Sequence, residues 1–244
     1  MDKIIKTTLA LFIVLLAAFT GIIAITVYQE TAYRDTISGT YNYTCTITTD
    51  VPLSNVTFFI PVPMDTTGNS PMVSAFSSRM MNGVPAEWKT TLFDTGKATL
   101  VKVTTPGIVT PEGTSAQHPY TITFSSEATS RTPIDTMNPV EKSALFRPVQ
   151  ALNGNPCPQG TADGRSRCFT YTTSLYADYS AAAEATVTIT STVSGKNTWT
   201  IFEPRSNEYH TVVSTRMNGE NHGWVVLEGE LTSGTGTYDI PSGA

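Results

Sequence analysis

Strict alternation of apolar and polar side chains is the feature that most restricts the fold of this chain. In TYNYTCTITT, Thr40–Thr49, positions 41, 43, 45 and 47 carry tyrosine, cysteine or isoleucine, and the positions between them carry mostly threonine. ATVTITSTV, Ala185–Val193, alternates in the same way. Because successive side chains of a β-strand point to opposite faces of the sheet, both stretches predict strands with one buried face and one face covered by hydroxyl groups.

Other short segments have the composition of strands and are separated by turn-forming residues. They are VTFFIPVP, AEWKTTLF, KATLVKV, YTITF, FTYTTSLY, NTWTIF and GWVVLEGEL. A chain of about eight to ten short strands predicts a mainly β fold, an antiparallel β-sandwich. The strand pattern lapses from Ser125 to Arg167, where Asn138–Phe146 has the capping and proline signals of a short helix. Between Ser206 and Gly219 the apolar spacing fits either a second short helix or a strand.

The amino-terminal part of the chain contains nineteen residues without a charge, Leu9–Val27. A helix of that length is about 28 Å long, close to the ~30 Å hydrocarbon core of a bilayer. Lys3 and Lys6 precede this run and the next basic residue is Arg34, so the positive-inside rule predicts a cytoplasmic amino terminus. We therefore expect a single-pass protein of the cell membrane, bound to lipid through this helix, whose C-terminal domain is extracellular.

A cleaved signal peptide is the alternative to a membrane anchor. The small-residue sites Ala18-Phe19-Thr20 and Ala24-Ile25-Thr26 carry threonine where a cleavage site prefers alanine, and the run is longer than the usual apolar core of a signal peptide. We favour the anchor, and both interpretations export the domain. The predicted organisation is an anchor or signal peptide at 1–28, a polar stalk at 29–36 and an extracytoplasmic β-sandwich domain at 37–244, with a helical or loop insertion around 125–168.

Composition excludes one class of partner. Charged residues make up 14% of the chain and the net charge is −5, against about 25% charged residues in an average soluble domain. The chain has no basic run, so it lacks the electrostatic surface that nucleic acid requires.

Two sequons agree with export. Asn42-Tyr43-Thr44 and Asn55-Val56-Thr57 match the acceptor pattern for N-glycosylation. In a strand, Asn42 shares the threonine face and Asn55 lies opposite Val56, so both side chains are expected to point to solvent.

The three cysteines are expected to have different roles. Cys157 and Cys168 enclose ten residues rich in turn formers, and in an exported domain a disulfide between them would stabilise this loop by roughly 3 kcal/mol. Cys45 is then unpaired. It is in phase with Tyr43 and Ile47, so we expect a small buried side chain and not a nucleophile or metal ligand.

Motifs that suggest chemistry have simpler explanations. Asp94-Thr95-Gly96 matches the triplet of aspartic proteases, but it also has the composition of a hairpin turn, and that chemistry needs two such carboxylates. Glu208 with His210, and Glu220 with His222, have a spacing at which one strand face could hold a metal, but turn formers surround the second pair and His118 precedes a proline in a loop. We predict no catalytic residue, no metal ligand and no cofactor.

Residues that could contact a ligand are few. Of the three tryptophans, Trp199 and Trp224 are in phase with core positions, so Trp88, between Glu87 and Lys89, is the one expected on the surface. Arg165 and Arg167, in the loop closed by the disulfide, are paired basic residues that could meet an acidic partner.

Three segments, PLSNVTFFIPVP, NPVEKSALF and WTIFEPRSNEY, resemble uncharacterised membrane-anchored surface proteins of methanogenic archaea. The resemblance implies a threonine-rich β-domain on the cell surface and assigns no catalytic residue. Our prediction is a structural or interaction module of the cell envelope, with an envelope protein or glycan as partner. The alternatives are a glycan-binding module, which an exposed planar row of aromatic rings would favour, and a hydrolase with an unrecognised carboxylate or histidine site.

Overall fold

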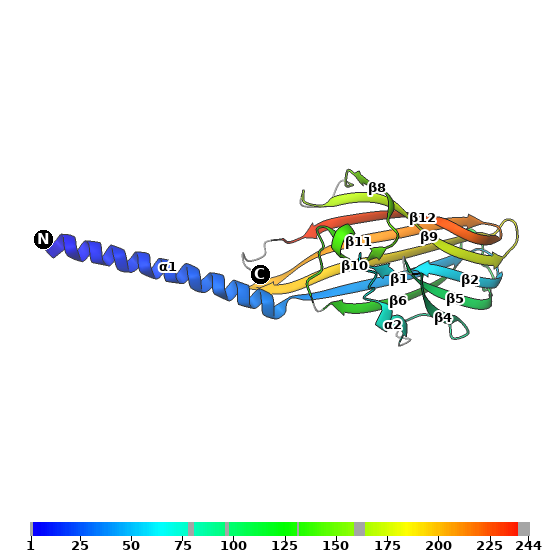
Figure 1. Ribbon diagram of the computed structural model, residues 1–244, viewed down its shortest axis with the longest axis horizontal. Helices are drawn as coiled ribbons and strands as arrows, with labels where there is room; N and C mark the ends of the chain where they lie inside the picture. Colours follow the sequence, from blue (N-terminus) through cyan, green and yellow to red (C-terminus); the bar gives the residue numbers. More distant parts are fainter. Residues whose placement is uncertain (1, 78–80, 96–97, 131, 159–163, 239–244) are drawn as a thin grey trace. The chain divides into compact units, whose positions relative to one another are not determined.

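The computed structural model describes residues 2–77, 81–95, 98–130, 132–158 and 164–238. Most of these residues are in strands, which confirms the prediction of a mainly β protein (Figure 1). The elements are α1 Asp2–Thr36, β1 Ser38–Thr49, β2 Leu53–Pro61, β3 Pro63–Met64, α2 Val73–Ser77, β4 Lys89–Asp94, β5 Thr99–Ile108, β6 Tyr120–Ser130, α3 Pro139–Lys142, β7 Leu145–Phe146, β8 Gln150–Asn155, β9 Arg167–Ser180, β10 Thr186–Ile201, β11 Glu203–Asn218 and β12 Asn221–Gly236.

The chain divides into two compact units, each with its own apolar cluster. The smaller unit is made of Met1–Ile37, Thr198–Ser206 and Thr237–Ala244. The larger unit is made of Ser38–Asn197 and Asn207–Gly236.

Ten strands form one hydrogen-bonded sheet. Its order is β4-β5-β2-β9-β12-β11-β10-β1-β6, and β8 pairs with β9 beside this path. A second, two-stranded sheet is made of β3 and β7. Strands that pair are often far apart in the chain, as where β2 pairs antiparallel with β9.

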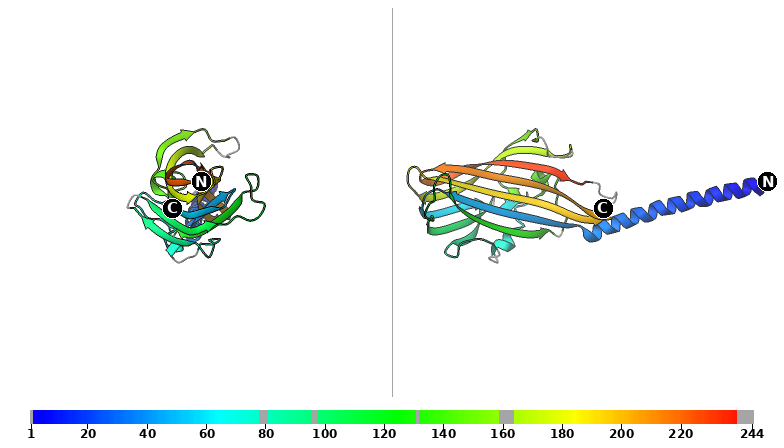
Figure 2. Two further views of the ribbon diagram at one scale, coloured as in Figure 1. Left: turned by 90° about the vertical axis from the view of Figure 1, so that its right-hand side faces the viewer. Right: turned by 180° about the vertical axis from the view of Figure 1, so that it is seen from behind.

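A sandwich of two facing sheets was predicted, and the hydrogen bonds show a different arrangement in the described residues. All described strands except β3 and β7 belong to one sheet, and this sheet is curled (Figure 2). The physical reason is strand length. Strands β9 to β12 are 14 to 16 residues long, and the right-handed twist of a sheet accumulates over long strands into a strong coil. The sheet therefore wraps its own apolar face.

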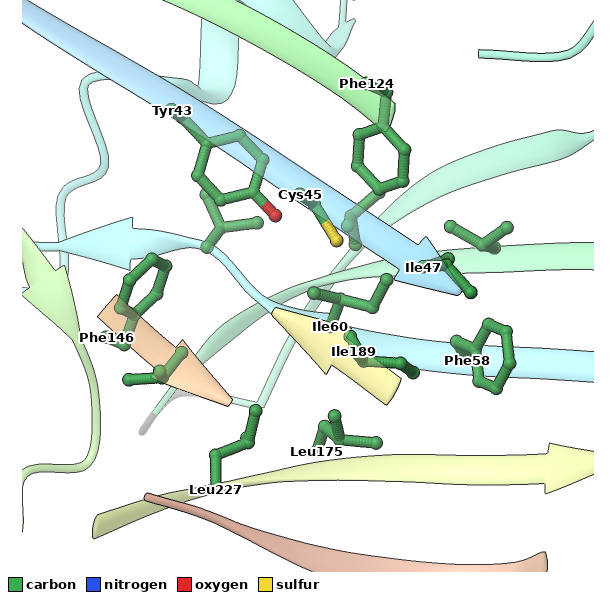
Figure 3. Packing of buried hydrophobic residues seen from close by; sticks show 14 of the residues in the cluster. Tyr43, Cys45, Ile47, Phe58, Ile60, Phe124, Phe146, Leu175, Ile189 and Leu227 are labelled. Carbon is green, nitrogen blue, oxygen red and sulfur yellow. The ribbon is translucent and has the colours of Figure 1, made fainter. Parts of the chain in front are cut away.

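The core confirms the alternation read from the sequence. In β1 and β10, nearly every second residue is buried, with the threonines on the other face. Figure 3 shows Tyr43, Cys45 and Ile47 projecting from β1 toward side chains of other strands. Segments outside the ten-stranded sheet also contribute to this core, since Met72 and Phe146 of β7 belong to the same cluster. Each of these large side chains stabilises the fold by about 1.5–3 kcal/mol through burial.

The region around 125–168 contains more strand than the sequence predicted. β6 continues to Ser130, and β7 and β8 lie within the expected insertion. The predicted helix is the short α3, and the side chain of Asn138 makes no capping hydrogen bond. From Glu203 to Asn218 the chain is the strand β11, so the helical alternative for Ser206–Gly219 is wrong.

In the smaller unit, α1 continues through the predicted stalk at 29–36. The side chains of residues 3–27 are exposed, and the helix is long and apolar enough to cross a membrane. Its last turns are packed, because Tyr33 is buried with Trp199 and Ile201. The rings of Tyr33 and Trp199 meet edge to face at 5.7 Å.

Candidate functional site

The predicted exposure of the tryptophans is wrong for two of the three. Trp88 is only 7% exposed and packs against the main core, and Trp224 is 63% exposed. Trp199 is buried, as expected. The backbone N–H of Trp88 donates to Pro85 O at 3.0 Å in a turn just before β4, and this turn directs the indole inward. Trp88 is therefore not a surface contact for a ligand.

Arg165 and Arg167 are both exposed. The guanidinium of Arg167 donates a hydrogen bond of 3.1 Å to Asn138 Oδ1, so it contacts a neighbouring segment of the same chain. Cys157 and Cys168 lie at disulfide distance, with 2.14 Å between their sulfur atoms. Residues 159–163 of the enclosed loop lie outside the described residues.

The other residues considered from the sequence lie as follows. Asn42 and Asn55 are exposed, and their glycosylation stays a prediction. Cys45 is a free, buried thiol, as expected, and burial raises its pKa to about 12, which removes it as a nucleophile at neutral pH. Asp94 and Thr95 lead into the predicted turn, since β4 pairs with β5. Gly96 and Lys97 lie outside the described residues.

Four aromatic side chains lie side by side on the outer face of the sheet, and we call them the aromatic strip. They are Phe93 of β4, Phe59 of β2, Tyr176 of β9 and Trp224 of β12. Consecutive ring centroids are 5.4, 5.6 and 5.7 Å apart. Each ring meets the next edge to face, an arrangement that stabilises a pair by about 0.5–1.5 kcal/mol. The strip is therefore held in place before any ligand binds.

Strand register builds this strip. Phe59 is opposite Tyr176, and Tyr176 is opposite Trp224. Side chains directly opposite in antiparallel strands share a face of the sheet. Lys102 is opposite Phe59 on the other side, and its Nζ lies 5.4 Å from the centroid of that ring. A line of cross-strand neighbours therefore runs across β5, β2, β9 and β12.

A shallow groove of about 390 Å³ follows the strip. Its lining is Thr57, Phe59, Phe93, Leu100, Tyr176, Asp178 and Trp224. The two outer rings are the accessible ones, because Phe93 is 48% exposed and Trp224 is 63% exposed. Large apolar groups that stay exposed in a continuous patch are typical of binding surfaces.

Polar groups stand at the Trp224 end of the strip. Asp178 is opposite His222 in the β9–β12 register, and Asp178 Oδ1 lies 2.7 Å from His222 Nδ1. Glu220 Oε2 is 3.7 Å from the other ring nitrogen. The hydrogen bond with Asp178 is the main cause that raises the pKa of His222 above its usual 6.5. Glu220 and His222, considered from the sequence as a metal pair, are in weak contact. No group of three or more residues suited to a metal occurs in the part of the chain that the structure describes.

A larger groove of about 850 Å³ lies over β8, β9, β11 and β12. Its lining is mostly polar and includes Arg216, Glu228 and Glu230. It lacks the exposed rings of the strip, so we regard the smaller groove as the candidate site.

Sequence reasoning missed the strip, although a signal was present. Trp224 is in phase with His222, Glu228 and Glu230, which are polar, and this phase marks the solvent face of β12. Val226 shares that face and is exposed too.

Comparisons with protein-family models, with curated proteins and with solved structures found no match to this chain.

Proposed function

We propose that this protein is a membrane-anchored module of the cell surface that binds an envelope glycan through the aromatic strip. The observation that carries the proposal is the row of four neighbouring rings with Trp224 largely exposed at one end. The proposal includes no catalytic step.

The chemistry of a sugar fits this surface. The faces of an aromatic ring are electron-rich and attract polarised C–H groups, which line one face of many pyranose rings. Consecutive rings are nearly perpendicular, so a sugar would stack on the accessible outer rings, Phe93 and Trp224. At the edge of the strip, the Asp178 carboxylate can accept hydrogen bonds from sugar hydroxyl groups, and a ring N–H of His222 can donate one to them. An apolar surface with a few polar groups beside it is the usual design of a binding site.

Location is the second part of the proposal. The exposed apolar helix α1 would span the membrane, and Lys3 and Lys6 would keep the amino terminus in the cytoplasm. The disulfide and the exposed Asn42 and Asn55 are consistent with an extracytoplasmic domain. The resemblance to archaeal surface proteins points the same way.

A binding experiment with a matched control tests the glycan. The full-length protein in detergent would be run by native affinity electrophoresis through gels that contain glucan, mannan, galactan or soluble chitin. We expect at least one polysaccharide to retard the wild type, and Trp224→Ala to weaken that binding by tenfold or more, equivalent to about 1.4 kcal/mol.

Val226→Ala is the control, because Val226 lies on the same strand and face and is 62% exposed, but outside the groove. It should bind like the wild type. Equal loss in both variants, or retardation of the wild type by none of the polysaccharides, would refute the proposal. Release of reducing sugar ends from the retained polysaccharide would favour the hydrolase instead.

A further inference from the structure

The smaller unit has its own exposed aromatic feature, at the tip of the hairpin between β10 and β11. Phe202 occupies the tip and is 69% exposed. We propose that Phe202 inserts, beside Tyr28, into the lipid headgroups on the extracytoplasmic side of the bilayer. The hairpin would then be a second point of attachment to lipid. This inference rests on the anchoring part of the proposed function and is independent of the glycan.

The end of the apolar run locates the membrane surface along α1. The uncharged segment ends at Val27, and Tyr28 follows it. Two residues later the charges begin, with an ion pair of 2.6 Å between Glu30 and Arg34. Tyrosine and tryptophan are enriched where a membrane-spanning helix leaves the hydrocarbon, because their rings suit the boundary between apolar chains and headgroups. Tyr28 is therefore expected at that level.

Contacts within the smaller unit bring the hairpin to the same level. The backbone N–H of Thr200 donates to Thr36 Oγ1 at 2.9 Å, and Trp199 packs on Tyr33, as described above. One step further toward the tip, the ring of Phe202 lies 5.3 Å from the ring of Tyr28. Along the helix these contacts progress from the last turn back toward the apolar run. The hairpin consequently points at the membrane, with Phe202 at the level of Tyr28.

Backbone geometry makes Phe202 an unusual choice for this tip. Its φ is +61°, in the left-handed region that glycine and asparagine occupy easily and a bulky side chain occupies only at an energetic cost. The ring is also exposed, so burial within the described chain does not offset that cost. Transfer of the ring into the headgroup region would offset it.

The residues around the tip suit a boundary. Glu203 follows Phe202, and its carboxylate lies 3.6 Å from the guanidinium of Arg205. Ile201 on the other side is buried. The hairpin thus presents one aromatic ring with charged groups directly behind it, which matches an apolar layer covered by polar headgroups.

Spin labels on the full-length protein in phosphatidylcholine vesicles test the inference. Three single-cysteine substitutions would carry a nitroxide: Phe202→Cys, Asp35→Cys and Ala18→Cys. Asp35 is exposed in the same unit and lies about 10 Å farther along the helix than Tyr28, so it is the matched aqueous control. Cys45 is buried, and its raised pKa keeps it unreactive to the label. Wild-type protein treated with the label measures any remaining background.

We expect the label at 202 to collide with a water-soluble nickel chelate at least threefold less often than the label at 35. The label at 18 should collide mainly with oxygen, as in hydrocarbon. If the label at position 18 is deep in the bilayer but the label at 202 is as accessible to nickel as the label at 35, the hairpin inference fails and the membrane anchor stands. If 18 is itself accessible to nickel, both fail.

A second variant guards against a distorted tip. Phe202→Trp keeps an aromatic ring, and its added fluorescence should be quenched by lipids brominated near the headgroup. Fluorescence unaffected by those lipids would also overturn the inference.

Discussion

Phe58 and Phe59 are neighbours in the chain and lie on opposite faces of β2. Phe58 is fully buried, whereas Phe59 is partly exposed between Phe93 and Tyr176 in the aromatic strip. A strand must send one side chain of any adjacent pair outward. The outward ring of Phe59 is stabilised by these two rings and by the small apolar cluster of Met64, Ala98 and Leu100. Tyr176 and Trp224 lie on the outer face for the same reason, because alternate side chains of a strand point to opposite faces of the sheet.

His222 carries a prediction about pH. The Asp178 carboxylate raises its pKa above 6.5, so its contribution to stability is fully present below the pKa of the unfolded state and is lost as pH rises through the folded pKa. The side chain is exposed, so the effect on the free energy of unfolding should be small. In an NMR titration we expect the His222 midpoint to lie above 6.5 and to fall toward it in Asp178→Asn.

Glu220→Gln should lower the midpoint less, because Glu220 contributes less than Asp178 to the shift. The resonances of His118, in a separate loop, should not respond to either substitution. An unchanged His222 midpoint in Asp178→Asn would show that the 2.7 Å contact is not kept in solution.

Among the elements, β8 depends most on a covalent link. All six of its residues are exposed, and it pairs with the first part of β9 through an irregular register. Asn155 is opposite Cys168, and Cys157 follows two residues later, so the disulfide joins the chain just beyond β8 to the start of β9. With little apolar burial of its own, β8 is held mainly by this bond and its backbone pairing.

Removal of the disulfide should loosen this element first. We expect the Cys157→Ser/Cys168→Ser double variant to lose up to about 3 kcal/mol in the free energy of unfolding, because the unfolded chain gains conformational entropy when this loop is no longer closed. Hydrogen exchange should speed up at the amides of β8 and the first residues of β9, with β1 and β10 unchanged. Equal acceleration across β10 would show that the bond supports the whole sheet.

The element β11 shows how one pattern can fit two structures. Tyr209, Val213 and Met217 repeat every four residues, which suits one face of a helix. They also lie at even separations, and in the structure they share the buried face of the strand with Thr211. Partners on both sides in the sheet decide for the strand, because pairing with two neighbours satisfies backbone N–H and C=O groups along it.

At the scale of the whole molecule, anchoring and export give the next prediction. The protein should stay with membranes after an alkaline carbonate wash, and its intact mass after extraction should be at least the 26.3 kDa of the full chain. Any mass above this value would come from glycans at Asn42 and Asn55. Each of Asn42→Gln and Asn55→Gln should therefore remove part of it. External protease should digest the domain on intact cells. A mass that lacks the apolar segment would instead identify a cleaved signal peptide.

The sequence alone determined the faces of the strictly alternating strands β1 and β10, the exposed apolar helix and the pairing partner of Cys157. These properties depend on residues close together in the chain, since strand alternation and loop closure are local. Only the tertiary structure decided which strands are neighbours. Phe59 and Tyr176 are far apart in the sequence and meet because β2 pairs with β9. A single curled sheet and a two-layer sandwich require the same alternation along each strand, so the long-range register that assembles the aromatic strip is set by packing of the whole core.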